Sequence, residues 1–130
     1  MAPPSPLAIA TQAVNRLVKE ESYYHKEQAN QEKRIKKLAG DIANNSPDLD
    51  SNAEYILKQE RRSLEETKAM FEPLRKRIVD AVDKLEEQIA ISESDGTGSE
   101  EELKKAKEAL EAGQKIATEE EAAQERHEEL

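Results

Sequence analysis

The sequence predicts an all-α fold, an elongated antiparallel three-helix bundle with left-handed, coiled-coil-like packing. Between residues 51 and 91, apolar side chains recur mostly at spacings of three, four and seven, as on one helix face. A helix of that length measures about 60 Å at roughly 1.5 Å per residue, so other long helices must lie along it. Composition agrees, because 38% charged residues, 3% aromatic residues and a mean hydropathy of -0.95 favour a thin apolar seam over a thick core. The stripe comprises Ala53, Leu57, Leu64, Phe71, Leu74, Ile78, Ala81, Leu85 and Ile89.

The first helix is predicted over residues 6–39. Ser5 suits an N-cap and Pro6 suits the first helical position, where the missing amide proton costs nothing. Gly40 can adopt the left-handed conformation that closes a helix, and the turn formers that follow up to Asp50 predict a loop. A connection of this length returns the second helix antiparallel to the first.

The seam of this first helix is apolar at both ends and polar in its middle, at Glu21, Gln28 and Gln31. One interpretation is that the polar stretch faces only part of the bundle; the other is a buried polar layer that fixes register. The first is favoured, because the seams of long helices are often imperfect. The apolar positions are Val14, Leu17, Tyr24, Ile35 and Leu38.

The second helix is predicted over residues 51–91, opened by a capping box of Ser51 and Glu54. Pro73 removes a backbone donor and crowds the carbonyl of Ala69. Two outcomes are open, a kink near Pro73 in one helix or a break near Glu72 into two. The kink is favoured, since the apolar stripe keeps its phase through this region.

A loop over residues 92–99 precedes a third helix, predicted over residues 99–118 or slightly beyond, with Ser99 as its cap. Gly113 either weakens this helix or lets a neighbouring helix approach closely. Residues 1–130 are predicted to form one helical-bundle domain with flexible ends at 1–5 and 119–130. The third stripe comprises Leu103, Ala106, Leu110, Ile116 and Ala117.

Catalytic and metal-binding patterns are not found in the sequence. Cysteine is absent, and His25 and His127, the two histidines, lie far apart without metal-ligand spacing. A solvated acidic helix face accounts for the carboxylates better than a paired acid and base, which need burial. We expect no enzyme activity, no metal and no cofactor.

Nucleic acid and membrane partners are also disfavoured. The basic runs 33–37 and 75–77 belong to a chain of net charge -9, which repels phosphate, and few aromatic residues are present for base stacking. No apolar run approaches a membrane span, and no signal-type segment opens the sequence. These features predict a soluble cytoplasmic interaction protein.

The first predicted helix resembles that of the tubulin-folding cofactor A family, also called tubulin-specific chaperone A. The likeness lies in residues 15–20, in Tyr24, Lys26 and Glu27, and in the run 28–38. Residues 53–57 with Glu60 and Arg62 resemble the start of that family's second helix, and the third helix resembles it more weakly. The likeness covers most of residues 11–118. It rests on all of these positions together and not on any single motif.

This resemblance implies a chaperone that captures β-tubulin folding intermediates and holds them on the route to the αβ-tubulin heterodimer. It further implies a cytoplasmic, cytoskeleton-associated protein without nucleotide or metal, with other tubulin-folding cofactors as further partners. A monomer is favoured over a homodimer. The alternative from another class is a self-associating structural coiled-coil protein. The partner face expected from the matching positions is Arg16, Lys19, Glu20, Tyr24, Glu27, Glu54, Glu60 and Arg62.

Overall fold

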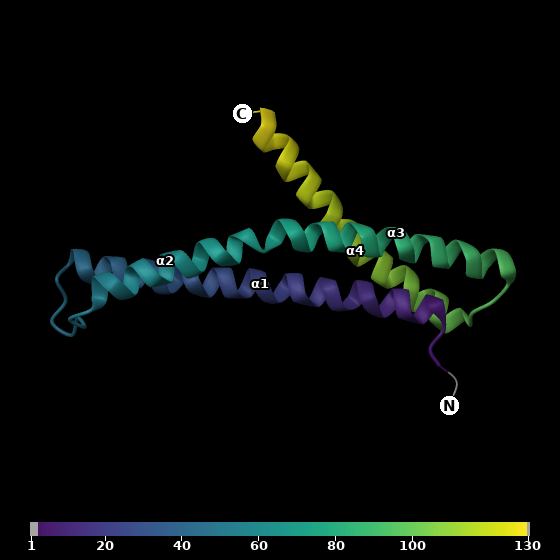
Figure 1. Ribbon diagram of the computed structural model, residues 1–130, viewed down its shortest axis with the longest axis horizontal. Helices are drawn as coiled ribbons and strands as arrows, with labels where there is room; N and C mark the ends of the chain where they lie inside the picture. The colour runs from purple at the N-terminus through teal and green to yellow at the C-terminus, as the bar shows by residue number, and fades with distance from the viewer. Residues whose placement is uncertain (1–2, 130) are drawn as a thin grey trace. The chain divides into compact units, whose positions relative to one another are not determined.

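The computed structural model describes the backbone of residues 3–129 and the side chains of residues 3–119. Within these residues the chain forms four helices and no strand (Figure 1), which confirms the all-α prediction. The helices are α1 (Pro6–Ala43), α2 (Ala53–Ala69), α3 (Phe71–Asp95) and α4 (Glu100–Glu129).

The helices are distributed over two compact units, and α1 contributes to both. The terminal unit consists of Met1–Glu20 and Glu72–Leu130, and the hairpin unit consists of Glu21–Phe71. The predicted single domain over residues 1–130 stays a prediction.

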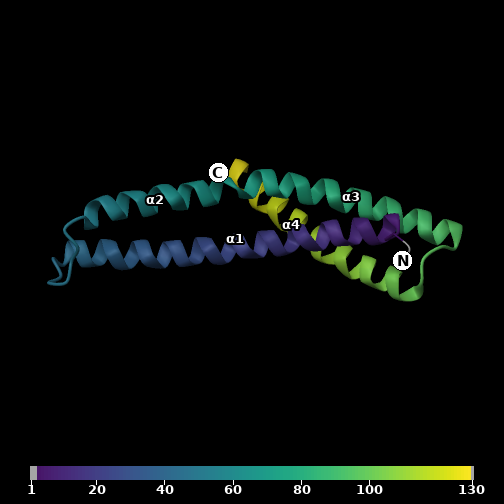
Figure 2. The ribbon, with the colours of Figure 1, turned by 60° about the horizontal axis from the view of Figure 1, so that its bottom comes forward.

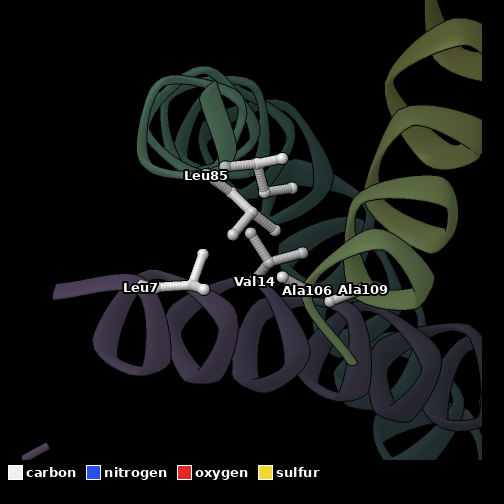
Figure 3. Packing of buried hydrophobic residues seen from close by; sticks show 6 residues of the cluster. Leu7, Val14, Leu85, Ala106 and Ala109 are labelled. Atoms are coloured by element: carbon white, nitrogen blue, oxygen red, sulfur yellow. The ribbon is translucent and has the colours of Figure 1, made fainter. Parts of the chain in front are cut away.

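The terminal unit has an apolar core to which three helices contribute. Leu7 and Val14 come from α1, Leu85 and Ile89 from α3, and Ala106 and Ala109 from α4 (Figure 3). Ion pairs and hydrogen bonds run in opposite order along α3 and α4: Lys107 contacts Glu93 at 2.9 Å, and Gln114 donates to Glu86 at 2.7 Å. Helix α4 is therefore antiparallel to α3, and both lie along the first part of α1 (Figure 2).

Gly113 marks the closest approach within this core. A Cβ atom at this position would lie 2.6 Å from Cγ2 of Val82 on α3 and 3.0 Å from Cγ1 of Val14 on α1. Both distances are shorter than ordinary van der Waals contact. Of the two roles considered for Gly113, close approach of neighbouring helices is the one that this geometry fits.

The hairpin unit pairs the later part of α1 with α2. Arg34 contacts Glu60, and further back along α1 the ring of Tyr24 meets that of Phe71. Later residues of α1 thus meet earlier residues of the returning segment, so the two segments are antiparallel. Figure 1 shows the loop that joins them.

Helix α1 begins as predicted and ends later. Ser5 accepts a hydrogen bond from the amide of Ala8 at 3.1 Å, and Pro6 is the first helical residue. The predicted end near Ala39 is wrong, since α1 continues through Gly40 to Ala43. The left-handed conformation expected at Gly40 is instead adopted by Asn45, with φ of 50°; asparagine tolerates this conformation better than most residues.

The second predicted helix, over residues 51–91, is divided in the structure. Helix α2 ends at Ala69, Met70 stands alone, and α3 begins at Phe71. The bend therefore lies at Met70 and not near Pro73, where the kink was predicted. Pro73 falls in the first turn of α3, a position that tolerates proline, and it cannot donate to the carbonyl of Ala69. That missing donor is a physical reason for the helix to be interrupted on the amino-terminal side of the proline.

The start of α2 also corrects the sequence prediction. The helix begins at Ala53 with Asn52 at the cap position and without a side-chain cap, so the capping box of Ser51 and Glu54 is not formed. Asp50 instead accepts a hydrogen bond from the amide of Asn52 at 2.7 Å. This aspartate turn pairs the amide of Asn52, whereas the box was expected to pair the amides of Ser51 and Glu54.

The loop before α4 is formed by residues 96–99, and both of its glycines, Gly96 and Gly98, have positive φ. Ser99 accepts a hydrogen bond from the amide of Glu102 at 3.1 Å, as its predicted cap role requires. Helix α4 continues to Glu129, past the predicted end near Thr118. Flexible ends were predicted over residues 1–5 and 119–130. Of these, residues 1, 2 and 130 and the side chains of 120–129 lie outside the described residues, and the flexibility of the rest stays a prediction.

The polar middle of the α1 seam is buried. Glu21 is 9% exposed and Gln31 is 5% exposed, while Gln28 is half-buried. The favoured interpretation, a stretch that faces only part of the bundle, stays a prediction, because the burial of these two residues does not test it. The buried polar layer fits, although its role in fixing register stays a prediction.

Candidate partner-binding face

The eight residues expected at the partner face are divided between the two units. Arg16, Lys19 and Glu20 belong to the terminal unit. The other five belong to the hairpin unit: Tyr24, Glu27, Glu54, Glu60 and Arg62.

In the terminal unit, Glu20 is engaged in an ion pair and the two basic residues are exposed. Oε1 of Glu20 accepts a hydrogen bond from Nη2 of Arg77 at 3.4 Å, which links α1 to α3. Exposed pairs of this kind contribute about 0–1 kcal/mol. Arg16 and Lys19 are exposed, and no ion pair between either of them and another described residue is observed. Their charges are therefore available to a partner.

In the hairpin unit, two of the predicted carboxylates converge on an arginine that the sequence did not single out for this face. Arg34 lies 4.0 Å from Oε1 of Glu27 on its own helix and 3.4 Å from Oε2 of Glu60 on α2. Glu27 and Glu60 are therefore partly neutralised, and the pair of Arg34 with Glu60 links α1 to α2. The sequence signal for Arg34 was the basic run 33–37, which was considered only as a nucleic-acid patch.

Tyr24 belongs to an aromatic cluster. Its ring meets that of Phe71 at 6.4 Å and that of Tyr23 at 5.6 Å, both edge to face. The ring of His25 lies 4.6 Å from Phe71, and its Nε2 pairs with the buried carboxylate of Glu21. Half-buried Tyr24 thus packs within the hairpin, whereas Tyr23, 61% exposed, is the tyrosine of this cluster that a partner can reach.

Glu54 and Arg62 are exposed on α2. Glu54 lies in the first turn, where its negative charge complements the positive end of the helix dipole. Neither residue is seen in an ion pair with another described side chain.

The terminal unit also has a groove between α1 and α3 that the sequence did not reveal. Its volume is about 610 Å³, and small side chains from Ala10, Ala13 and Ala81 line it beside exposed Ile9. Because these side chains are small, a shallow groove remains between α1 and α3. Alanines in a helical stripe do not by themselves predict such a groove. Charged side chains at the groove are Arg77, Asp80, Lys84 and Glu87.

Two further searches of the described residues gave no site. No group of three or more histidine, aspartate or glutamate side chains is arranged to hold a metal ion there. In the same part of the chain, no helix combines the length and apolar character that crossing a membrane requires.

The family model of tubulin binding cofactor A matches residues 2–110, which is most of the chain and covers the whole hairpin unit and most of the terminal unit. The chain belongs to the tubulin binding cofactor A family. Membership supports a role as a tubulin-folding cofactor, a chaperone role and not an enzymatic one. No curated protein and no solved structure matched the chain.

Proposed function

We propose that this protein captures and holds β-tubulin folding intermediates on the route to the αβ-tubulin heterodimer. The observation that carries the proposal is the family match over residues 2–110, which spans α1, α2, α3 and the first part of α4. Arg16 and Lys19 are exposed cations that pair with no carboxylate among the described side chains, and they provide a contact surface that needs no rearrangement of the core.

We further propose that the protein works as an antiparallel, left-handed bundle in which α2 and α3 together act as the second helix. It acts in the cytoplasm in association with the cytoskeleton, as a monomer, and meets other tubulin-folding cofactors when the client is passed on. Its own chemistry is binding alone, without nucleotide or metal.

We propose the partner face predicted from the family likeness, and we expect its residues to contribute to binding in two different ways. Arg16, Lys19, Glu54 and Arg62 are exposed and carry the contact. Glu27 and Glu60 act by holding Arg34, and Tyr24 acts by supporting the aromatic cluster that presents Tyr23. The first group is expected to affect affinity directly, and the second is expected to affect it through the hairpin.

A native-gel shift with purified β-tubulin, α-tubulin and intact heterodimer tests this function. The proposal predicts a shifted band with β-tubulin alone. Charge reversal of Arg16→Glu with Lys19→Glu should weaken that shift, because both side chains are exposed and their loss leaves helicity unchanged. A matched control is Lys104→Glu with Lys105→Glu, two exposed lysines on α4 in the same unit. If both double variants bind like the original chain, Arg16 and Lys19 do not contribute to the face.

Light scattering on the same samples separates this function from the alternative, a self-associating structural coiled coil. A monomer mass together with a β-tubulin shift supports the chaperone. A dimer mass without any tubulin shift rejects it and favours the coiled coil.

A further inference from the structure

Helix α1 carries a lysine stripe along its solvent face in the hairpin unit. Lys26, Lys33 and Lys37 are spaced by seven and four residues, so they lie above one another on one face of the helix. All three are exposed, and the side chain of Lys37 is 82% exposed. Tyr23 and Asn30 occupy the intervening positions of the same face and are exposed as well. From residue 23 to residue 37, this face contains no carboxylate.

The carboxylates of α1 near the stripe lie off this face or contact other side chains. Glu27 lies beside Arg34, and Glu32 accepts a hydrogen bond from Gln28 at 3.0 Å. Asp41 contacts Lys37 at 3.5 Å and is the first acidic residue at the end of the stripe. Lys26 and Lys33 are not seen in ion pairs within the described part of the chain. The stripe therefore has positive charge that the protein itself leaves uncompensated.

The lysine stripe lies in the unit of the chain in which basic and acidic residues nearly balance. The protein has a net charge of -9, yet the hairpin unit, residues 21–71, carries 9 basic and 10 acidic residues. The acidic excess thus belongs almost entirely to the terminal unit. A negatively charged partner is repelled least at the hairpin unit, where exposed lysines such as those of the stripe can attract it.

We propose that the lysine stripe of Lys26, Lys33 and Lys37 binds an acidic segment of a partner protein, rich in glutamate or aspartate. Exposed lysines on flexible stems suit carboxylates presented by an extended or helical peptide, since no fixed pocket is required. Tyr23 adds an apolar surface at one end of the stripe. The proposal rests on α1 alone and goes beyond the tubulin proposal, because its three lysines lie outside the face proposed for tubulin.

Fluorescence anisotropy of a labelled polyglutamate peptide, titrated with the full chain at low and at physiological salt, tests this inference. We expect binding that weakens steeply with salt, because the pairs are exposed. The triple variant Lys26→Gln, Lys33→Gln, Lys37→Gln should bind about tenfold more weakly. Glutamine retains a helix propensity close to that of lysine, and circular dichroism checks that the helices persist.

Two control variants distinguish binding at the stripe from a general effect of the net charge. The variant Lys104→Gln, Lys105→Gln, Lys107→Gln changes the net charge equally on α4, within the acidic terminal unit, and should bind the peptide like the original chain. The variant Lys26→Arg, Lys33→Arg, Lys37→Arg keeps the charge and should retain binding.

Equal weakening in the α4 variant, or no weakening in the stripe variant, would overturn the proposal. A single-stranded oligonucleotide of equal charge is a further probe. Tighter binding of this probe than of the peptide would identify a phosphate-binding surface instead. Light scattering at low salt gives the fourth contrary result, a doubled mass of the protein that the peptide does not reduce. The stripe would then be covered by a second copy of the chain.

Discussion

Replacing Gly113 by alanine tests how closely α4 packs against α1 and α3. In an exposed helix this change stabilises a protein by about 0.5–1 kcal/mol, since alanine is the better helix former. Here the new Cβ would lie 2.6 Å from Val82 and 3.0 Å from Val14, side chains that are 5% and 1% exposed. Valine is stiff at χ1 and cannot easily turn away, so the helices must move apart.

The balance of the two effects predicts a loss of stability. Overpacking of a core costs about 1–3 kcal/mol, which exceeds the gain in helix propensity and leaves a net loss of about 1–2 kcal/mol for Gly113→Ala. Gly40→Ala is a matched control, because Gly40 lies inside α1 and a Cβ there meets no atom within 4 Å. The control should gain about 0.5–1 kcal/mol.

Urea denaturation followed by circular dichroism measures both changes as shifts of the midpoint at a constant slope. The variant Val82→Ala in the Gly113→Ala background should cost less than the sum of the two single changes, by about 1 kcal/mol or more, because it removes the clash. Equal stabilisation by Gly113→Ala and Gly40→Ala would refute the close packing of α4. Additive effects of Val82→Ala and Gly113→Ala would refute the contact between these two positions.

Three further changes test local features. Ser99→Ala should lower the free energy of unfolding by about 1 kcal/mol, because Ser99 caps α4; an unchanged urea midpoint would mean that the cap contributes nothing. Gln31→Met should raise the free energy of unfolding by about 1 kcal/mol, since the buried Oε1 of Gln31 lacks a hydrogen-bond partner among the described residues; a lower urea midpoint would reveal a missed partner. Pro73→Ala should slow hydrogen exchange of the amides around Met70, because it restores a donor to the carbonyl of Ala69; unchanged exchange would show that the interruption has another cause.

The periodicity of apolar residues predicted the helical segments and part of their buried faces, but not the interruption at Met70 or the burial of Val82 and Ala109. Of the stripe predicted between residues 51 and 91, Leu74, Ile78 and Leu85 are at most 1% exposed. Spacing alone determines this result, because a helix must bury the one face that is apolar. The helix ends were less predictable, since Gly40 can either close a helix or continue it, and the surrounding contacts decide.

The partner face was predictable only as a set of positions. Which charges are free depends on pairs that cross between helices, such as Arg34 with Glu60 and Arg77 with Glu20. These pairs join residues 26 and 57 positions apart, and nothing in the local sequence marks them. The burial of Glu21 and Gln31 was considered but not favoured for a similar reason, because polar residues in a seam are buried only where the neighbouring helix lies close.

The most direct test of the tubulin proposal is the mass of the complex that the protein forms with freshly released β-tubulin. Size-exclusion chromatography with light scattering should show a complex of one copy of each chain, formed with β-tubulin and not with α-tubulin. Separate elution of β-tubulin and this protein under the same conditions would contradict the proposal that it captures β-tubulin.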